Sequence, residues 1–430
     1  MDLLKRIENK EARVGIIGLG YVGLPLAIEF ARAGFHVVGF DVDQSKVDAL
    51  NSGTSYIPDV SSQHVAEVVK NGFFRATVDE RELADVDIID ICVPTPLRKT
   101  RDPDLSFVIQ AVETTARVLR KGQLVILEST TYPGTTDEVV QPALEAKGLK
   151  AGEDFYLAFS PERVDPGNPT YQTKNIPKVV GGNNDASTKA AVRFYSQVID
   201  TVVPVASTRV AEMVKLLENT FRAVNIGLVN ELALMSHRMN IDVWEVIDAA
   251  KTKPFGFMPF YPGPGLGGHC IPIDPFYLSW KARQSGFEAR FIELAGHVNG
   301  AMPEYVVERT AEALNSQKKA LNGSRIHVFG VAYKRDVNDM RESPALDIME
   351  LLKKRGAVVS YTDPYVPELE HGTLNLRSVQ EEKAANGIDC ALIVTDHKVF
   401  DYARMAKAFP LIVDTRNALK NVESETIFRL

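Results

Sequence analysis

Short apolar runs alternate with amphipathic segments over the first 205 residues of the chain. Each run ends in small or polar residues, as buried strands do, and the runs are RVGIIGLG, HVVGFD, DIIDICVPTP, GQLVILEST, DFYLAFSPE and KVVGG. Helical segments between such strands are typical of βαβ units, because parallel strands need a long crossover connection. The pattern therefore predicts a parallel sheet built from βαβ units to about residue 205.

The pattern changes after residue 206. Between Ser207 and Asn240 there is no proline and only one glycine, and apolar residues recur every three or four positions. These residues are Val210, Val214, Leu217, Phe221, Val224, Leu228 and Leu232. Such spacing predicts one face of a helix, and a helix of about 30 residues is about 45 Å long. We expect this helix to bridge two domains and to offer a subunit interface.

Strand patterns return after residue 317, in the runs RIHVFGVAY, AVVSYTD, DCALIVTD and PLIVDTR. Helical patterns such as SPALDIMELLKKRG separate these runs. We therefore predict an α/β protein in which two Rossmann-like doubly wound sheets are joined by a long central helix and a helical domain. The predicted domains are residues 1–205, 206–317 and 318–430.

The composition excludes several classes of partner. A net charge of −7 gives no basic footprint of the kind that favours nucleic acid as a partner. No apolar run approaches the roughly 18 residues of a membrane helix. The first apolar stretch is broken by glycines, so it does not have the pattern of a signal peptide. The cysteines Cys92, Cys270 and Cys390 are far apart without a CxxC pair, which favours reduced thiols over disulfides or zinc. We expect a cytoplasmic protein without a membrane segment or a metal.

The sequence GLGYVG directly follows the apolar run VGII and opens a helical pattern. In this setting Gly18 permits the turn, Gly20 lets the backbone approach a pyrophosphate, and Gly23 lets helix and strand pack closely. Asp41 ends the next run, 41 − 23 = 18 residues after Gly23, close to the spacing expected for a carboxylate that binds a ribose diol. Asp41 and Asp43 would repel a 2′-phosphate, so NAD is favoured over NADP, while FAD stays an alternative.

Five further polar residues follow strand-like runs or share a helix face. Thr95, Thr130 and Glu162 each follow such a run, and in open α/β sheets ligands bind outside the carboxyl ends of strands. Lys215 and Asn219 lie four residues apart on the predicted long helix, so they share one face. That face could stabilise an oxyanion or bind a sugar hydroxyl. The alternative is an ordinary solvated helix face.

Three cations follow strand-like runs near the end of the chain: Lys334, Arg341 and Arg416. Such residues suit phosphates and carboxylates, which the arginines can bind in bidentate fashion. Cys270 lies in the Gly- and Pro-rich stretch PGPGLGGHCIPIDP. The local sequence alone leaves two interpretations of Cys270 open, a nucleophile or a small residue packed beside a tight turn.

Eight motifs, in order and over nearly the whole chain, resemble the UDP-sugar 6-dehydrogenases, a family that oxidises UDP-glucose, UDP-N-acetylglucosamine or UDP-N-acetylmannosamine. They are GLGYVGLPLA, VPTP, ESTTYPGTT, FSPER, AEMVKLLENT, GPGLGGHCIPIDP, GVAYKRDVNDMRESPA and TDPYV. The resemblance implies an N-terminal NAD-binding domain, a central helical dimerisation domain and a C-terminal UDP-binding domain. It also implies a four-electron oxidation of a sugar C6 alcohol to a carboxylate with two NAD.

The resemblance further implies a role for each motif residue. It implies catalysis by Cys270, Lys215, Asn219, Asp274, Glu162 and Thr130. It implies contacts with NAD from Gly18, Gly20, Tyr21, Val22, Gly23, Asp41, Lys46, Thr95, Thr130 and Arg341. It implies contacts with the UDP-sugar from Glu162, Arg163, Lys215, Asn219, Phe260, Tyr261, Gly267, Lys334 and Arg416.

Covalent chemistry explains why the family has a cysteine at the position of Cys270. A thiolate that adds to the intermediate aldehyde gives a thiohemiacetal, and loss of a second hydride leaves a thioester for water to hydrolyse. By resemblance, Lys215 and Asn219 would stabilise the oxyanions. Asp274 would assist proton transfer through water, and Glu162 would serve the hydrolysis step.

Two positions depart from the UDP-glucose members of the family. Those members carry a lysine immediately before the residue that matches Asp274, where this chain has Ile273. They also tend to have a second glutamate four residues after Glu162, where this chain has Pro166. Lys215 and helix dipoles are then the candidates for thiolate activation, and Asp165 is a candidate for the missing glutamate.

At both positions the chain resembles the family members that act on N-acetylated sugars. The stretches FSPERVDPGN and KPFGFMPFYPGPG are most similar to the members that act on UDP-N-acetylglucosamine. We therefore expect a homodimer or higher homo-oligomer that makes a uronic acid sugar nucleotide for a surface polysaccharide such as a capsule or O-antigen. UDP-N-acetylmannosamine and UDP-glucose stay alternative substrates. Two further classes of protein stay open: a β-hydroxyacid dehydrogenase, which explains neither Cys270 nor the second sheet, and a non-catalytic nucleotide-binding protein.

Overall fold

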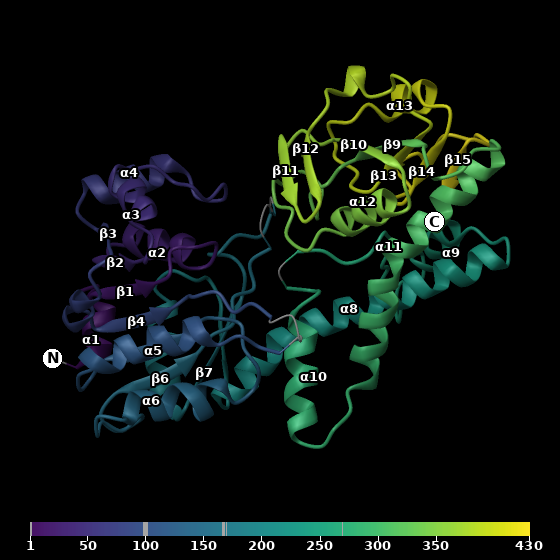
Figure 1. The fold of residues 1–430 in the computed structure, drawn as a ribbon. Helices are drawn as coiled ribbons and strands as arrows, with labels where there is room; N and C mark the ends of the chain where they lie inside the picture. Colours follow the sequence, from purple (N-terminus) through teal and green to yellow (C-terminus); the bar gives the residue numbers. More distant parts are fainter. Residues whose placement is uncertain (1, 98–101, 166–167, 169, 269) are drawn as a thin grey trace. The chain divides into compact units, whose positions relative to one another are not determined.

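The structure, a computed structural model, describes residues 2–97, 102–165, 168, 170–268 and 270–430 (Figure 1). The chain forms two compact units. Unit 1 comprises Met1–Glu218 and Trp280–Gly286, and unit 2 comprises Asn219–Ser279 and Phe287–Leu430. The α/β class, the two doubly wound sheets and the long helices that link them in the chain confirm the predicted fold. The predicted domain boundaries at residues 205 and 317 stay a prediction.

Unit 1 is built on an eight-stranded sheet with the order β3-β2-β1-β4-β5-β6-β7-β8. The strands are β1 (Val14–Ile17), β2 (Val37–Phe40), β3 (Phe74–Thr77), β4 (Ile88–Ile91), β5 (Leu124–Leu127), β6 (Tyr156–Phe159), β7 (Lys178–Gly182) and β8 (Val202–Val205). The helices are α1 (Leu3–Glu8), α2 (Gly23–Arg32), α3 (Gln44–Asn51), α4 (Ser62–Lys70), η1 (Glu80–Asp85), α5 (Ser106–Val118), η2 (Thr136–Val140), α6 (Gln141–Glu145) and α7 (Asp185–Tyr195).

The central strands of the unit 1 sheet are buried on both faces, which is why they read as continuous apolar runs. In β5, Leu124 and Ile126 join one hydrophobic cluster, and Val125 and Leu127 join another. This alternation follows from the two-residue period of a strand. Helices α1, α2, α3, α4 and α7 contribute to the first cluster, and α5 and α6 contribute to the second. Figure 1 shows α2 and α5 on opposite sides of the sheet.

Two strands of unit 1, β7 and β8, run against the predicted direction. All neighbouring strands pair in parallel except β6 and β7, which are antiparallel with Phe159 opposite Gly181. The wholly parallel sheet expected to residue 205 is therefore wrong at β7 and at β8, which pairs in parallel with β7. The physical reason is the connection, because the described residues between β6 and β7 form no helix that could provide the crossover that a parallel pair requires. Residues just before β7 consequently lie at the same edge of the sheet as residues just after β6.

Unit 2 contains a five-stranded parallel sheet with the order β10-β9-β13-β14-β15 and a two-stranded sheet of β11 and β12. The strands are β9 (Arg325–Phe329), β10 (Val358–Thr362), β11 (Glu368–His371), β12 (Leu374–Arg377), β13 (Cys390–Ile393), β14 (Ile412–Asp414) and β15 (Ile427–Arg429). From β9 the chain continues to β10 on one side of β9 and later to β13 on the other side, so the order of the strands reverses beside β9. Ligands of open α/β sheets bind at the carboxyl ends of the strands where the strand order reverses in this way. Lys334 follows β9 and Arg416 follows β14.

The helices of unit 2 include the second part of the long helix α8 (Thr208–Arg238), which begins in unit 1. The others are α9 (Val243–Ala250), the first part of α10 (Asp274–Gln284), which ends in unit 1, α11 (Arg290–Ser316), α12 (Pro344–Lys354), η3 (Glu381–Lys383) and α13 (Tyr402–Ala408). The predicted long helix between Ser207 and Asn240 is confirmed. Four residues of its apolar stripe are nevertheless exposed, namely Val210, Leu217, Phe221 and Leu228.

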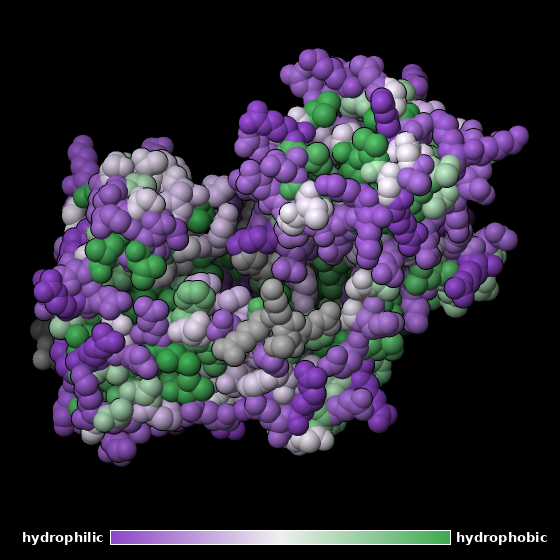
Figure 2. All heavy atoms as spheres, in the orientation of Figure 1, coloured by the Kyte–Doolittle hydropathy of each residue, from purple (hydrophilic) through white to green (hydrophobic). Residues whose placement is uncertain are grey.

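The described part of the chain contains no helix that is both long enough and apolar enough to span a membrane. On the face drawn in Figure 2, hydrophilic residues dominate and hydrophobic residues form smaller patches.

Candidate active site

The glycine-rich turn between β1 and α2 uses each of its glycines for a different reason. Gly18 has a φ of +92°, and a Cβ there would lie 2.7 Å from the carbonyl oxygen of Cys92. A Cβ on Gly23 would lie 1.9 Å from the carbonyl oxygen of Gly18. A Cβ on Gly20 would instead point into open space. Gly20 therefore lies at an open backbone surface, which fits the close approach of a pyrophosphate.

The residues that complete this turn leave the start of α2 free of side-chain caps. Tyr21 is exposed, and Val22 occupies the N-cap position of α2 without a side-chain hydrogen bond. An anion at this end of the helix would meet backbone N–H groups and the positive end of the helix dipole.

Asp41, directly after β2, lies beside the glycine-rich turn. Its carboxylate accepts hydrogen bonds from the backbone N–H groups of Leu19 and Asp43, both at 3.0 Å. The ammonium of Lys46 lies 3.7 Å from Oδ2 of Asp41. The structure thus brings together Asp41, Lys46 and the turn, as a site for the ribose of a dinucleotide requires.

Thr95 and Thr130 follow β4 and β5, which are adjacent in the sheet. Lys215, on the first part of α8, donates a hydrogen bond from Nζ to Oγ1 of Thr130 at 2.5 Å. Lys215 is buried rather than part of a solvated face, since only 8% of its surface is exposed. The structure therefore joins two predicted catalytic residues that lie 85 positions apart.

Glu212, one turn before Lys215 on α8, was not predicted from the sequence. Its carboxylate accepts hydrogen bonds from the backbone N–H groups of Gly134 (2.5 Å) and Thr136 (2.8 Å) and from the Thr136 hydroxyl (2.7 Å). Burial raises the pKa of Glu212 to about 7, although these hydrogen bonds oppose the shift. Glu212 ties the loop that carries Thr130 to α8, and so holds Thr130 against Lys215.

Glu162, after β6, is buried and faces a cation that sequence reasoning missed. Its Oε1 accepts the backbone N–H groups of Arg163 (2.7 Å) and Val164 (2.6 Å), and its Oε2 lies 3.4 Å from the ammonium of Lys178. Arg163 is held by Glu218 of α8, with a shortest contact of 2.6 Å. Asp165 accepts a hydrogen bond from the Asn168 side chain at 3.3 Å. Pro166 lies outside the described residues.

In unit 2, Cys270 lies at the N-terminal approach to α10. Its carbonyl accepts hydrogen bonds from the backbone N–H groups of Ile273 (3.1 Å) and Asp274 (2.8 Å), which close the turn that starts the helix. The Asp274 carboxylate accepts a hydrogen bond from the Asn219 amide at 2.6 Å, and both side chains are buried. The structure thus joins the start of α10 to the long helix through two of the predicted catalytic residues.

The loop before Cys270 packs against the segment that follows β9. A Cβ on Gly267 would lie 2.8 Å from Cβ of Tyr333, and one on Gly268 would lie 2.6 Å from the ring of Tyr333. The backbone N–H of Gly268 donates to the carbonyl of Arg341 at 3.1 Å. The glycines are therefore needed for close packing beside Lys334. Arg341 belongs to unit 2, unlike the other predicted cofactor contacts, and its guanidinium pairs with Asp339.

Arg416 lies against the same loop. A Cβ on Gly263 would lie 2.6 Å from a guanidinium nitrogen of Arg416, and Nε of Arg416 donates to the Val394 carbonyl at 2.8 Å. Burial and the nearby Arg335 lower the pKa of Arg416 to about 10, while Asp414 opposes this shift. Within the described residues, no carboxylate forms an ion pair with Arg416. A guanidinium in these surroundings favours an anionic ligand such as a phosphate.

The two predicted aromatic contacts at the start of the loop pack within unit 2. Phe260 lies 5.7 Å from Phe221 of α8, measured between ring centroids. Tyr261 stacks on Trp244 with a centroid distance of 6.0 Å and donates from its hydroxyl to Asp248 at 2.9 Å. In the single chain, both side chains fix the start of the loop to α8 and α9.

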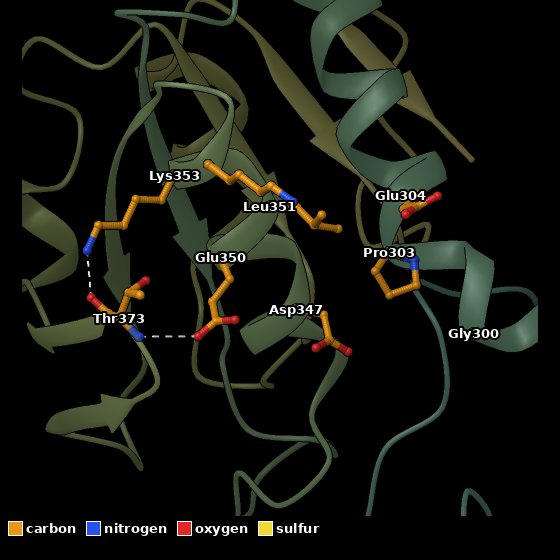
Figure 3. A pocket seen from close by; sticks show the side chains of 9 residues that line it. Gly300, Pro303, Glu304, Asp347, Glu350, Leu351, Lys353 and Thr373 are labelled. Carbon is orange, nitrogen blue, oxygen red and sulfur yellow. Dashed lines mark hydrogen bonds between the residues drawn. The ribbon is translucent and has the colours of Figure 1, made fainter. Parts of the chain in front are cut away.

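A cavity of about 730 Å³ in unit 2 lies elsewhere, among α11, α12 and the turn between β11 and β12 (Figure 3). No predicted site residue lines it. Within it, Lys353 donates to the Thr373 carbonyl at 2.6 Å, and the Thr373 N–H donates to Glu350 at 3.4 Å. The cavity is therefore not part of the predicted active site.

Models of the UDP-glucose/GDP-mannose dehydrogenase family match three successive parts of the chain. The NAD binding domain matches residues 12–199, the central domain matches residues 209–301 and the UDP binding domain matches residues 327–421. The matched NAD binding domain agrees with the open glycine-rich turn, and the matched UDP binding domain contains Lys334 and Arg416.

Relatives match over most of the chain. The chain is 36% identical over 424 residues to the UDP-N-acetyl-D-mannosamine dehydrogenase of Pyrococcus horikoshii, covering 97% of this chain and 98% of the relative. It is 37% identical over 359 residues to the UDP-N-acetyl-D-glucosamine 6-dehydrogenase of Pseudomonas aeruginosa, covering 83% and 84%. A solved structure of the Pyrococcus horikoshii enzyme has a TM-score of 0.88 and covers 97% of this chain and 98% of that one. The chain therefore belongs to the UDP-glucose/GDP-mannose dehydrogenase family and is an NAD-dependent UDP-sugar 6-dehydrogenase.

Proposed function

We propose that the chain oxidises the C6 alcohol of UDP-N-acetylglucosamine to the carboxylate through a thioester on Cys270. The observation that carries this proposal is the position of Cys270, which closes the first turn of α10 beside the Asp274–Asn219 hydrogen bond of 2.6 Å. The positive end of the α10 dipole favours a thiolate at this position. UDP-glucose members of the family have a lysine at the position of Ile273. The helix dipole would take over the role of that lysine in favouring the thiolate.

The proposed mechanism divides one difficult oxidation into steps that the side chains can assist. Gly20, Asp41 and Lys46 would hold NAD, which would supply the hydride acceptor for each of the two oxidations. Cys270 adds its sulfur to the aldehyde carbon, and the second oxidation converts the resulting thiohemiacetal into a thioester. Lys215 and Asn219 stabilise the negative oxygen in each tetrahedral state. Asp274 moves protons through water and Thr130 holds a water, whereas Glu162 accepts the proton of the water that hydrolyses the thioester.

The UDP group is proposed to bind in unit 2, where Arg416 and the loop from Phe260 to Gly268 come together. Burial disfavours the charged form of the Arg416 guanidinium and lowers its pKa. A bound diphosphate would supply negative charge beside this guanidinium. Lys334, beside Tyr333 in the segment that packs on Gly267 and Gly268, is the second proposed contact. The product, a uronic acid sugar nucleotide, is proposed to serve synthesis of a surface polysaccharide.

The choice of sugar is tested by comparing UDP-N-acetylglucosamine with UDP-N-acetylmannosamine, which differ at C2. The mannosamine enzyme is the second candidate because the Pyrococcus horikoshii relative, named for that sugar, is 36% identical over 97% of this chain. A site built for one C2 configuration leaves a polar group unpaired with the other, which costs about 10-fold or more in kcat/KM. We expect the higher kcat/KM with UDP-N-acetylglucosamine, and the reverse order would assign the chain to the mannosamine substrate.

Replacing Asp41 with asparagine tests the proposed ribose contact. A hydrogen bond to a charged group contributes about 1.5–3 kcal/mol, so we expect the KM for NAD to rise about 10- to 100-fold with little change in the KM for the UDP-sugar. Discrimination against NADP should fall as well, because a negative charge that repels the 2′-phosphate is lost. Asp48→Asn, an exposed change on α3, is the control. An unchanged KM for NAD in Asp41→Asn would refute the contact.

We propose that a second copy of the chain covers the exposed apolar stripe of α8. Leu228 is 52% exposed in the single chain, and Leu217, Phe221 and Met235 on the same helix are exposed too. A stripe of this kind along a 31-residue helix is typical of an interface between subunits. This proposal keeps the expected homodimer or higher homo-oligomer.

The Leu228→Arg variant should weaken self-association, because the interface would then bury an unpaired charge. We expect the dissociation constant of the dimer to rise about 10-fold or more, the equivalent of about 1.4 kcal/mol, as measured by sedimentation velocity over a range of concentrations. Val399→Arg, at an exposed apolar residue in the loop after β13, is the matched control. Identical sedimentation of Leu228→Arg and the native chain would place the interface elsewhere.

A further inference from the structure

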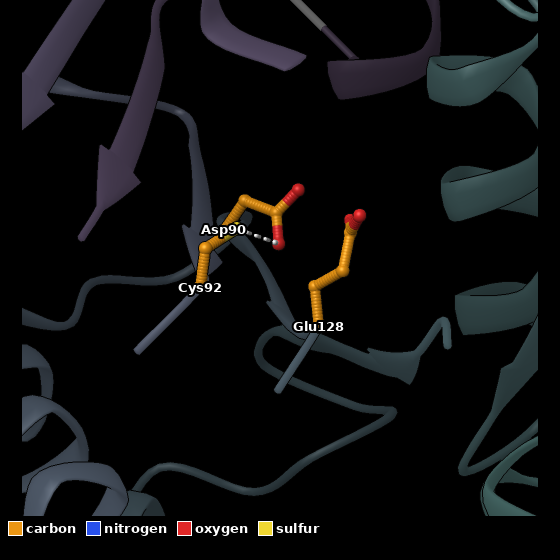
Figure 4. A group of neighbouring side chains, drawn as sticks. All are labelled: Asp90, Cys92 and Glu128. Atoms are coloured by element: carbon orange, nitrogen blue, oxygen red, sulfur yellow. Dashed lines mark hydrogen bonds between the residues drawn. The ribbon is translucent and has the colours of Figure 1, made fainter. Parts of the chain in front are cut away.

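A cluster of buried ionisable groups lies behind Glu162 in unit 1. Lys178 donates from Nζ to Oε1 of Glu128 at 2.6 Å, and its ammonium lies 3.4 Å from Glu162. The Tyr195 hydroxyl donates to Glu128 at 2.5 Å and lies 3.1 Å from Asp90. Figure 4 shows Asp90 and Glu128 with their carboxylates close together. Three carboxylates thus surround one ammonium group away from water.

The topology of the sheet explains how these groups meet. Asp90 lies in β4, and Glu128 directly follows the adjacent strand β5. Since β7 is antiparallel to β6 with Phe159 opposite Gly181, Lys178 at the start of β7 reaches the edge where Glu162 leaves β6. A parallel β7 would have placed Lys178 at the opposite edge of the sheet.

We propose that Lys178 is a positioning residue for thioester hydrolysis, which holds the Glu162 carboxylate in place and ready to accept a proton. This inference rests on the proposed function. In the step concerned, water adds its oxygen to the thioester carbon and gives a proton to Glu162. The C–S bond then breaks and releases the carboxylic acid and the Cys270 thiolate. Lys178 touches none of the reacting atoms and acts only through Glu162.

The charges around Glu162 support this assignment. Lys178 from β7 and Lys215 from α8 face it with positive charge, Glu128 lies beside Lys178, and two backbone N–H groups bind its Oε1. Burial alone would raise the pKa of Glu162, but Lys178, a hydrogen bond with the Glu128 side chain and the backbone hydrogen bond from Val164 outweigh burial and lower it. Burial raises the pKa of Asp90 to about 6 and that of Glu128 well above its ordinary value. Of the three carboxyl groups near Lys178, Glu162 is therefore the one whose pKa is lowered by its surroundings.

A bound metal is the other interpretation of this cluster, because Asp90, Cys92 and Glu128 lie close enough to share an ion. The ammonium of Lys178 already lies 2.6 Å from Glu128, so a cation there would be repelled by the lysine. Burial also raises the pKa of the Cys92 thiol, which disfavours the thiolate that a metal would need. The lysine thus supplies the positive charge of the cluster.

The test compares Lys178→Met, which removes the charge at similar volume, with Lys178→Arg, which keeps it. In Lys178→Met the pKa of Glu162 rises, so the acidic limb of the kcat profile should move to higher pH, because Glu162 must be ionised to accept the proton. We expect kcat at neutral pH to fall about 10- to 100-fold, part of what a general base contributes. The ratio kcat/KM for the UDP-sugar should stay nearly unchanged, because the steps up to the thioester are not impaired. Lys178→Arg should retain most activity and the native pH profile.

Two further readouts separate this role from a structural one. In Lys178→Met, rapid mixing should give a burst of about two NADH per subunit before slow turnover, because only the hydrolysis step is impaired. Mass spectrometry should then find the thioester on Cys270. Lys121→Met, which removes an exposed ion pair with Asp154 at 2.8 Å, is the control for loss of a lysine from unit 1. If Lys178→Met does not fold, Lys178→Gln keeps a donor without the charge and makes the same prediction.

The possible outcomes distinguish this inference from the proposed function. A native ratio of two NADH per sugar, together with an unmoved acidic limb and no burst in folded Lys178→Met or Lys178→Gln, overturns only the role of Lys178. A native ratio of one NADH per sugar overturns the proposed thioester route itself, and with it the hydrolysis step that Lys178 serves.

Discussion

Replacing Cys270 with serine should reduce the rate of NADH formation by on the order of 10³-fold or more, as removal of a covalent nucleophile does in other enzymes. A serine hydroxyl is a much weaker nucleophile than a thiolate, so it should form the hemiacetal that the second oxidation needs far more slowly. Affinity for the UDP-sugar should change little, because the proposed diphosphate contacts come from Arg416 and Lys334. The measurement is steady-state NADH formation together with equilibrium binding of the UDP-sugar.

Cys390→Ala is the matched control for loss of a thiol. Cys390 is fully buried in β13, and burial raises its pKa to about 12, so it cannot act as a nucleophile. Its replacement should leave turnover close to native. Turnover of Cys270→Ser within about tenfold of native would contradict the covalent route and favour a two-electron dehydrogenase, such as a β-hydroxyacid dehydrogenase.

Replacing Lys215 with methionine should lower kcat by about 10²- to 10³-fold, the usual cost of removing one donor that stabilises an oxyanion. Lys215 is buried and hydrogen-bonded to Thr130 at 2.5 Å, and Glu212 fixes the loop that carries Thr130. The charge is therefore held in place before substrate binds, which is what makes such a donor effective. Methionine has a similar volume, so the packing around α8 should be kept. The measurement is kcat and KM at several pH values.

The control for Lys215→Met is Lys189→Met on the exposed surface of α7, which should leave kcat and KM unchanged. A rise in KM with an unchanged kcat in Lys215→Met would mean that Lys215 binds the ground state and the transition state equally well. That result would remove it from the proposed mechanism.

The fold could be predicted where one physical pattern dominated. The run LVIL became β5 because a strand buried on both faces must be apolar throughout, and the three- and four-residue spacing between Ser207 and Asn240 became α8. The hairpin of β11 and β12 was not predicted, since charged residues such as Glu368 and Arg377 interrupt its apolar positions. The direction of β7 was also not predicted, because a run such as KVVGG has no polarity of its own.

The candidate site could be predicted residue by residue but not as pairs. Lys215 and Thr130, or Asn219 and Asp274, were each singled out from motifs, yet only the folded chain brings each pair within hydrogen-bond distance. Lys178 was missed because a lysine at the start of an apolar run resembles an ordinary strand end. A signal was nevertheless present, since Asp90 and Glu128 are carboxylates within or directly after apolar runs, where a charge needs a buried partner.

The most direct test of the proposed mechanism is the number of NADH formed per UDP-N-acetylglucosamine consumed by the native chain, with Cys270→Ser in parallel. A ratio of about two, lost together with turnover in the serine variant, is the result expected of a four-electron oxidation through a thioester. A ratio of about one that survives the replacement would contradict it.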